Sequence, residues 1–68
     1  MTFGEVLKEL LYKNRMSVAE LAERVGLTRQ TIYLYMNGKS KDPTLTHAKK
    51  ICDVMGVSLD EMWRMMQG

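Results

Sequence analysis

The chain has 68 residues and a formal net charge of +2; 46% of its residues are hydrophobic and 26% are charged. This composition predicts one soluble domain, residues 1–68, near the lower size limit for a self-sufficient core. A single cysteine excludes an intramolecular disulfide, and one cysteine with one histidine cannot build a structural metal site. Because no membrane span or signal peptide is recognisable, we expect a cytoplasmic protein.

The charge is distributed unevenly along the chain. Residues 1–41 hold seven Lys and Arg against four Glu, whereas residues 42–68 hold three against four Asp and Glu. The positive excess in the first part favours a polyanionic partner, with a mildly basic solvated face as the alternative.

Apolar residues recur at helical spacing, and Ser, Thr, Gly and Pro interrupt them at short intervals. We expect an all-α domain of five helices, over residues 3–14, 18–25, 29–36, 45–55 and 59–66. Three Ser/Thr-x-x-Glu sequences, which begin at Thr2, Ser17 and Ser58, have the spacing of capping boxes. Gly26 and Gly56 stand where a left-handed residue would end a helix.

Each helix is predicted to turn one apolar stripe toward the core. The expected inner residues are Phe3, Val6, Leu7, Leu10, Leu11, Leu21, Ala22, Val25, Leu27, Ile32, Tyr35, Leu45, Ala48, Ile51, Cys52 and Met55. His47 and Cys52 lie five positions apart, about 140° around a helix, and so do not face each other. We expect Cys52 in the core and His47 on the surface.

The connection between the second and third helices is the most informative feature. Only Gly26 and Leu27 separate Val25 from the cap Thr28, and a turn this short forces the two helices to cross steeply. The geometry is that of a DNA-binding helix-turn-helix over residues 17–36. With the inner residues assigned, the outer face of the third helix presents Arg29, Gln30, Tyr33, Leu34 and Asn37.

Residues 17–32 (SVAELAERVGLTRQTI), followed by Asn37-Gly38-Lys39 and Pro43, resemble the Cro and lambda repressor-like family of phage and bacterial regulators, also called the xenobiotic-response-element family. Residues 56–62 (GVSLDEM) are similar to that family's last helix. The resemblance covers about residues 2–63. It implies a five-helix fold whose third helix lies in the DNA major groove, while the second crosses the backbone above it.

By position, the resemblance implies base-facing sites for Thr28, Arg29, Gln30 and Leu34, with Tyr33 at the groove edge. The chemistry agrees, because Arg can grip guanine O6 and N7, Gln can grip adenine N6 and N7, and apolar groups can contact a thymine methyl. Phosphate contacts position such a domain, and helix starts favour anions. The candidates for phosphate contact are Ser17, Thr31, Asn37, Lys39, Ser40 and Lys41.

Three positions depart from the family pattern or weaken it. Val18 replaces a Gln that commonly touches phosphate and braces the reading helix, and Met36 stands where the family often has an acidic residue. Asp42 adds a negative charge to the expected phosphate-facing loop. We therefore expect modest affinity for each subunit.

The end of the chain is unusually apolar. Met62, Trp63, Met65 and Met66 nearly encircle the last helix, and only one side of it can pack on the core. We predict a homodimer contact through Met62, Trp63 and Met66, with intramolecular packing of this tail as the alternative. Two-fold dimers read palindromic half-sites about one helical turn apart.

These patterns predict a sequence-specific regulator that binds double-stranded DNA and represses by occlusion. No acid pair, Gly-rich phosphate loop or nucleophile–base arrangement indicates an enzyme, and no cofactor is expected. One alternative is a protein-interaction module, such as an antitoxin-like or anti-repressor partner. Another is an accessory nucleic-acid-binding protein without sequence preference.

Overall fold

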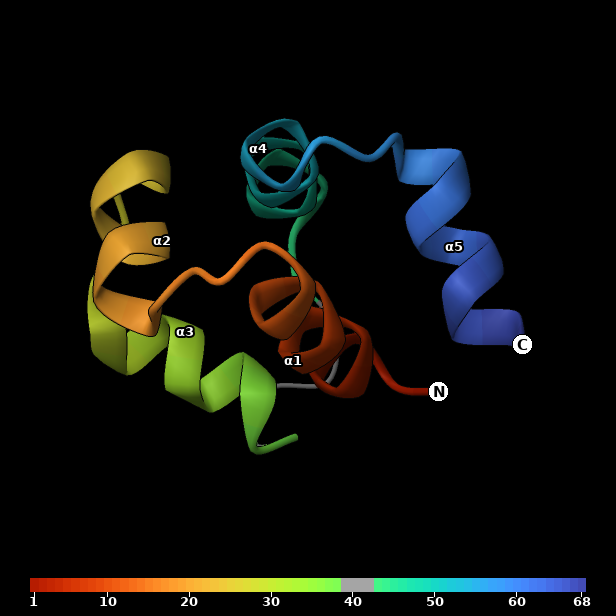
Figure 1. Cartoon of the computed structure of the whole chain (residues 1–68), viewed down its shortest axis with the longest axis horizontal. Coiled ribbons are helices and arrows are strands. Elements are labelled where there is room, and N and C mark those ends of the chain that lie inside the picture. Colours follow the sequence, from red (N-terminus) through yellow and green to blue (C-terminus); the bar gives the residue numbers. More distant parts are fainter. Residues whose placement is uncertain (39–42) are drawn as a thin grey trace.

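Five α-helices follow one another along the chain in the computed structural model, which describes residues 1–38 and 43–68 (Figure 1). They are α1 (Phe3–Lys13), α2 (Val18–Val25), α3 (Arg29–Met36), α4 (Leu45–Met55) and α5 (Leu59–Gln67). The described residues form no strand. The predicted all-α class is confirmed, and only two helix ends differ from expectation: α1 stops one residue earlier and α5 continues one residue further.

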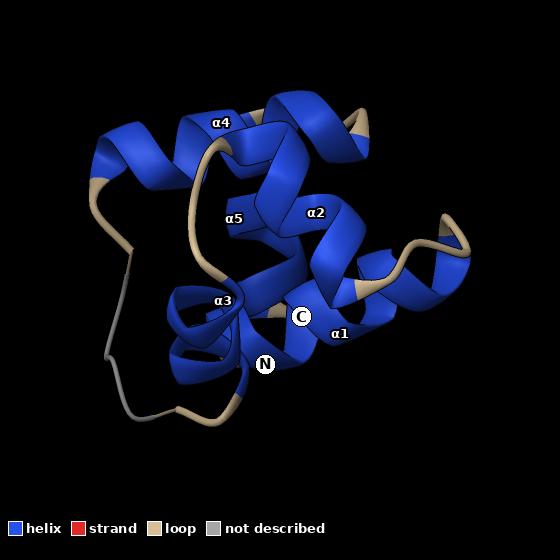
Figure 2. Cartoon of the chain, turned by 90° about the vertical axis from the view of Figure 1, so that its left-hand side faces the viewer, coloured by secondary structure: helices blue, strands red, loops and turns tan. Residues whose placement is uncertain are grey.

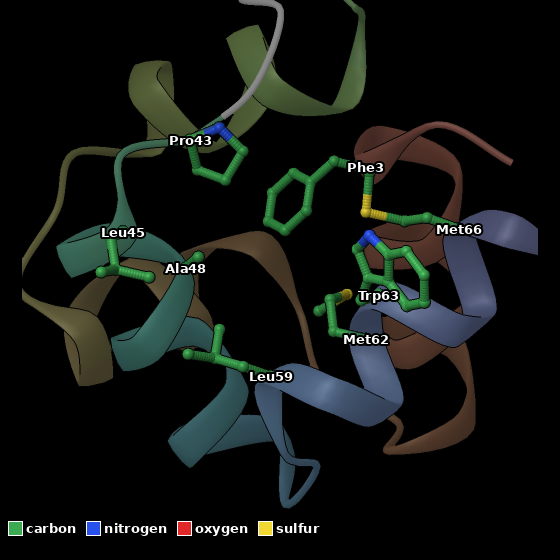
Figure 3. A pocket seen from close by; sticks show the side chains of 8 residues that line it. All are labelled: Phe3, Pro43, Leu45, Ala48, Leu59, Met62, Trp63 and Met66. Carbon is green, nitrogen blue, oxygen red and sulfur yellow. The ribbon is translucent and has the colours of Figure 1, made fainter.

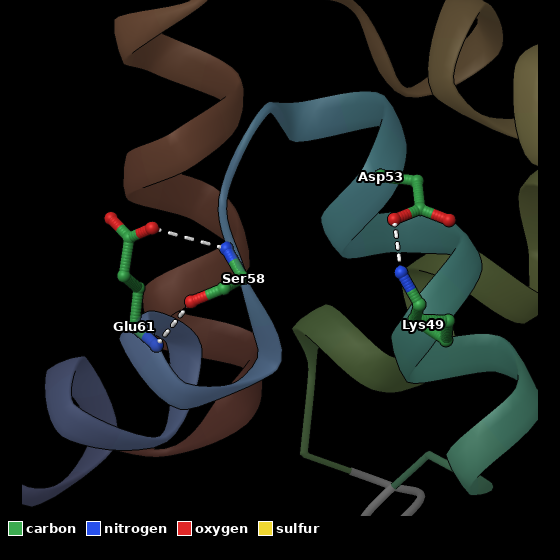
Figure 4. Close-up of polar contacts among 4 residues, drawn as sticks. All are labelled: Lys49, Asp53, Ser58 and Glu61. Atoms are coloured by element: carbon green, nitrogen blue, oxygen red, sulfur yellow. Dashed lines mark hydrogen bonds and ion pairs between the residues drawn. The ribbon is translucent and has the colours of Figure 1, made fainter.

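Side chains at the helix starts explain where the helices begin. At Thr2 the capping box is complete: the Glu5 amide donates to Thr2 Oγ1 (3.1 Å), and the Thr2 amide donates to Glu5 Oε1 (2.8 Å). The bond from the Thr2 amide, together with the Thr2 hydroxyl, lowers the pKa of the Glu5 carboxyl below its ordinary value. Ser58 and Glu61 form a second complete box, drawn in Figure 4, with distances of 3.0 and 3.2 Å.

The third predicted capping box is only half formed. The Glu20 amide donates to Ser17 Oγ (3.1 Å), as expected. The Glu20 carboxylate instead pairs with Arg24 one turn further along α2, at 2.8 Å. Because an i,i+4 partner of opposite charge competes for the same carboxylate, the return bond to the Ser17 amide is not made.

All five helices contribute buried side chains to one core. In Figure 1, α2 and α3 lie on one side of the molecule and α5 on the other, with α1 and α4 between them. Helix α1 packs on both α3 and α5, while α2 packs on α3 and α4. The most deeply buried side chains are Val6, Leu7, Leu21, Ile32, Ile51 and Cys52.

Leu45 is the one predicted core residue that the structure places on the surface, with 74% of its area exposed. It is the first residue of α4, and this first turn extends beyond the helices that cover the later turns (Figure 2). The apolar stripe of α4 therefore begins to be covered only at the half-buried Ala48. None of the helices in the described residues is both long and apolar enough for a membrane span.

Candidate nucleic-acid interface

A short turn sets the relation between α2 and α3. Gly26 ends α2 in the left-handed conformation (φ 74°), which glycine adopts without steric cost. The next amide, that of Leu27, donates to the Ala22 carbonyl at 3.0 Å and closes the turn. Ala22 is itself buried, and α2 packs on α3 beyond the turn. As a result α2 and α3 run in clearly different directions (Figure 2).

The first turn of α3 is organised by a pair of threonines. The Thr31 amide donates to Thr28 Oγ1 at 3.2 Å, and the two hydroxyl oxygens lie 2.9 Å apart in a second hydrogen bond. Thr28 is exposed and Thr31 is half-buried. The Thr28 hydroxyl is thus engaged in the cap, and its methyl group is the part that remains for an apolar contact.

The outer face of α3 carries the predicted base-reading side chains. Ile32 and Tyr35 are buried and fix which side of the helix faces inward. Residues 30, 33, 34 and 37 recur at the spacing of one helical face, and Arg29 lies one turn before Tyr33. The structure leaves all of these residues exposed: Arg29, Gln30, Tyr33, Leu34 and Asn37.

The charge on this face is that of Arg29 alone, because α3 contains no acidic residue of its own. The ion pairs among the described residues join Glu20 to Arg24 on α2, Lys49 to Asp53 on α4 (2.6 Å, Figure 4) and Asp60 to Arg64 on α5. None of these three pairs involves Arg29, which is exposed at the start of α3.

The predicted phosphate contacts are placed only in part. Ser17 is exposed at the start of α2, and Asn37 is exposed at the end of α3, where its amide donates to the Tyr33 carbonyl. Lys39, Ser40 and Lys41, together with Asp42, lie outside the described residues.

The two departures on described helices have a packing explanation. Val18 and Met36 are half-buried and pack against the core, Val18 at the first residue of α2 and Met36 at the last residue of α3. Both apolar side chains therefore contribute to the packing of the core.

His47 is not the surface residue that its position predicts. It is half-buried, and its Nδ1 atom forms a hydrogen bond of 2.8 Å with the Tyr35 hydroxyl. The sequence does contain a signal for this contact, because a tyrosine at an inner position of α3 needs a polar partner for its hydroxyl. The bond joins α3 to the start of α4.

A second surface, formed mainly by α4 and α5, is an apolar groove of about 320 Å³ (Figure 3). Trp63 and Leu45 are its most exposed members, and Trp63 is 59% exposed. We call this surface the α5 groove. It is lined by Phe3, Pro43, Leu45, Ala48, Leu59, Met62, Trp63 and Met66.

The predicted dimer residues occupy different depths in the α5 groove. Met62 is only 3% exposed, so it belongs to the core and to the groove floor, not to a free surface as expected. It is buried because it lies on the side of α5 that packs on α1 and α4. Met66 is half-buried, and Trp63 remains the projecting side chain.

A five-helix domain whose third helix is held across the second by a glycine turn, with an exposed Arg, Gln and Leu face, is a helix-turn-helix DNA-binding domain. Residues 6–67 match the Cro/C1-type HTH DNA-binding domain family. The chain belongs to this family.

Three known proteins illustrate the relationship. The crystal structure of SinR, a master regulator for biofilm formation, in complex with DNA has the same fold: the TM-score is 0.86 at 21% identity, over 91% of this chain and 98% of that one. The uncharacterized HTH-type transcriptional regulator YozG of Bacillus subtilis is 41% identical over 46 residues. That match covers 68% of this chain and 55% of YozG, so the chain spans about half of its relative.

The third relative is an enzyme. The (S)-2-hydroxypropylphosphonic acid epoxidase of Streptomyces wedmorensis is 35% identical over 57 residues, which are 84% of this chain but only 29% of the enzyme. Its solved structure superposes with a TM-score of 0.78 over 88% of this chain and 31% of that one. The likeness is confined to about a third of the enzyme, and the family of this chain is one of DNA-binding domains.

Proposed function

We propose that residues 1–68 form one sequence-specific DNA-binding unit of a transcriptional regulator that represses by occluding its operator. The observation that carries this proposal is the exposed face of α3, where Arg29, Gln30 and Leu34 project from a helix whose opposite face is locked into the core. The family match of residues 6–67 supports it.

In this proposal α3 lies in the major groove. Arg29 grips a guanine through O6 and N7, Gln30 grips an adenine through N6 and N7, and Leu34 contacts a thymine methyl. The Thr28 methyl offers a second apolar contact, and Tyr33 lies at the groove edge. The residues assigned to phosphate are Ser17, Thr31, Asn37, Lys39, Ser40 and Lys41, of which the last three are assigned from the sequence alone.

Selection of duplexes from a random pool tests this function directly. We expect enrichment of a palindromic site, and a selected duplex that binds about 10³-fold or more tightly than a scrambled one at physiological salt. The affinity for both duplexes should fall steeply with salt, because phosphate contacts release counterions. Equal affinity for selected and scrambled duplexes would reject sequence-specific reading and favour an accessory protein without sequence preference.

We further propose that two copies bind the operator together, through Trp63 and Met66 around the α5 groove. Trp63 is a large apolar side chain that is 59% exposed beside this groove. Trp63 and the α5 groove lie on the same face of the molecule. The Trp63 side chain of each copy can therefore enter the groove of the other, which is the isologous contact that two-fold symmetry requires. Such a dimer presents two copies of α3 to half-sites about one helical turn apart.

Trp63→Glu is expected to abolish this association, because it would bury a carboxylate in an apolar contact. Sedimentation is measured for the free chain and for its complex with the selected duplex. The complex should contain two copies per duplex for the parent and one for the variant. The matched control is Glu61→Gln, on the same helix. A Trp63→Glu variant that sediments like the parent in both states contradicts the dimer.

The α5 groove also favours a second candidate function, a protein-interaction module of the antitoxin or anti-repressor kind. Its lining is entirely apolar, as a helix-binding groove would be. Under this function the selection finds no preferred duplex, while the Trp63→Glu variant loses binding to a protein partner. The two functions therefore give opposite outcomes in the selection experiment.

A further inference from the structure

The backbone of α1 touches the backbone of α3 at Gly4. A methyl group placed on this buried glycine would lie 2.4 Å from the Tyr35 carbonyl oxygen and 2.9 Å from that of Met36. Real Cβ atoms essentially never approach closer than 3.0 Å. The two carbonyls belong to the last turn of α3, so the missing side chain of Gly4 is what permits this approach.

Two further contacts hold the same end of α3. The Phe3 ring, next to Gly4, meets the Tyr35 ring edge-on with their centres 5.7 Å apart. The Tyr35 hydroxyl is bonded to His47 Nδ1 at 2.8 Å. The end of α3 is thus fixed from α1 on one side and from α4 on the other. We call Gly4, Phe3 and His47 the α3 seat.

We propose that Gly4 is a positioning residue for DNA reading: the α3 seat fixes how α3 is aimed into the major groove. This inference rests on the proposed function. The obstacle to a side chain at position 4 is backbone, so no change of rotamer can make room for it. To reach the ordinary contact distance of 3.4 Å from 2.4 Å, α3 and α1 must separate by about 1 Å.

A displacement of this size matters at the reading face. Arg29 and Tyr35 are six residues apart on α3, or about 9 Å along its axis, so a shift at the seated end tilts the other end. A bidentate hydrogen bond needs both donor–acceptor distances within a few tenths of an ångström of about 2.9 Å. Phosphate contacts from long side chains tolerate a tilt far better, since they depend mainly on charge.

The test compares Gly4→Ala with the parent in the full chain, at a temperature where circular dichroism shows both to be folded. We expect the ratio of affinities for selected and scrambled duplexes to fall about tenfold or more. The affinity for the scrambled duplex and the salt slope should stay near the parent values. A purely structural role for Gly4 would lower the melting temperature and leave the ratio unchanged, and that result overturns the proposal.

Val6→Ala is the matched control, because it removes buried atoms from the same helix and adds none against α3. Val6→Ala should lower the melting temperature and leave the ratio of affinities for the selected and scrambled duplexes unchanged. If the Gly4→Ala protein does not fold, the Tyr35→Phe variant tests the α3 seat instead, because it deletes only the hydroxyl that forms the hydrogen bond with His47. A twofold to threefold fall in the ratio supports the α3 seat, and an unchanged ratio rejects it.

The outcome can be separated from that of the proposed function. If substitutions at Arg29 and Gln30 change the ratio and Gly4→Ala does not, only the α3 seat is wrong. If the parent itself shows no preference between the duplexes, the function fails and the proposal that depends on it is rejected as well.

Discussion

Replacement of both Arg29 and Gln30 by alanine is expected to lower the affinity for the selected duplex by about 30-fold or more, and so to remove much of the preference for it. Each bidentate contact to a base contributes roughly 1–3 kcal/mol of discrimination, and tenfold corresponds to about 1.4 kcal/mol. Affinity for a scrambled duplex should fall much less, because it loses only the charge of Arg29.

The single variants sharpen this prediction. Arg29→Ala should relax the choice of base at a guanine position, and Gln30→Ala at an adenine position, in a repeat of the random-pool selection. Arg64→Ala is the charge-matched control: it removes the same charge from α5, on the opposite side of the molecule from α3 in Figure 1. A double variant that keeps the parent's preference would mean that another surface reads the DNA.

Leu21→Ala is expected to cost about 2–5 kcal/mol of the free energy of unfolding, the usual cost of a buried Leu→Ala change. Leu21 is fully buried on α2, where that helix packs on α3 and α4. A domain of this size is typically stable by no more than about 3–5 kcal/mol. We therefore expect much of the Leu21→Ala protein to be unfolded at physiological temperature.

Leu45→Ala supplies the matched control, since the same atoms are removed from a side chain that is 74% exposed. It should change the free energy of unfolding by less than about 0.5 kcal/mol. Urea denaturation followed by far-ultraviolet circular dichroism measures both variants. Equal losses would show that Leu45 is buried in solution, as the sequence pattern alone suggested.

The helix boundaries could be predicted because they are set locally. Thr2 and Ser58 bond to backbone amides three residues away, and Gly26 is needed where the chain turns left-handed. The predictions for Glu20 and Leu45 were wrong because their surroundings depend on residues other than the amide three positions away. Glu20 pairs with Arg24 instead of closing its capping box, and Leu45 precedes the part of α4 that other helices cover.

The exposed face of α3 could also be predicted, because it is the complement of the buried Ile32 and Tyr35. The contacts that support this helix from behind were harder to predict. An inner Tyr35 indicates that its hydroxyl needs a polar partner, but the sequence does not identify His47 as that partner. The contact of Gly4 with α3 joins residues more than 12 positions apart, and helical periodicity says nothing about such pairs. Met62 was misplaced for a related reason: the packing of α5 decides which methionine of an apolar ring faces inward.

Cys52, the chain's single cysteine, lies 1% exposed in α4. Burial, with the nearby Asp53 carboxylate, raises the pKa of its thiol, so both access and ionisation suppress its reactivity in the folded state. An alkylating reagent can reach the Cys52 thiol only when α4 separates from its neighbours. The rate of thiol modification therefore measures how often the domain opens, and Cys52 serves as a built-in probe of native-state unfolding.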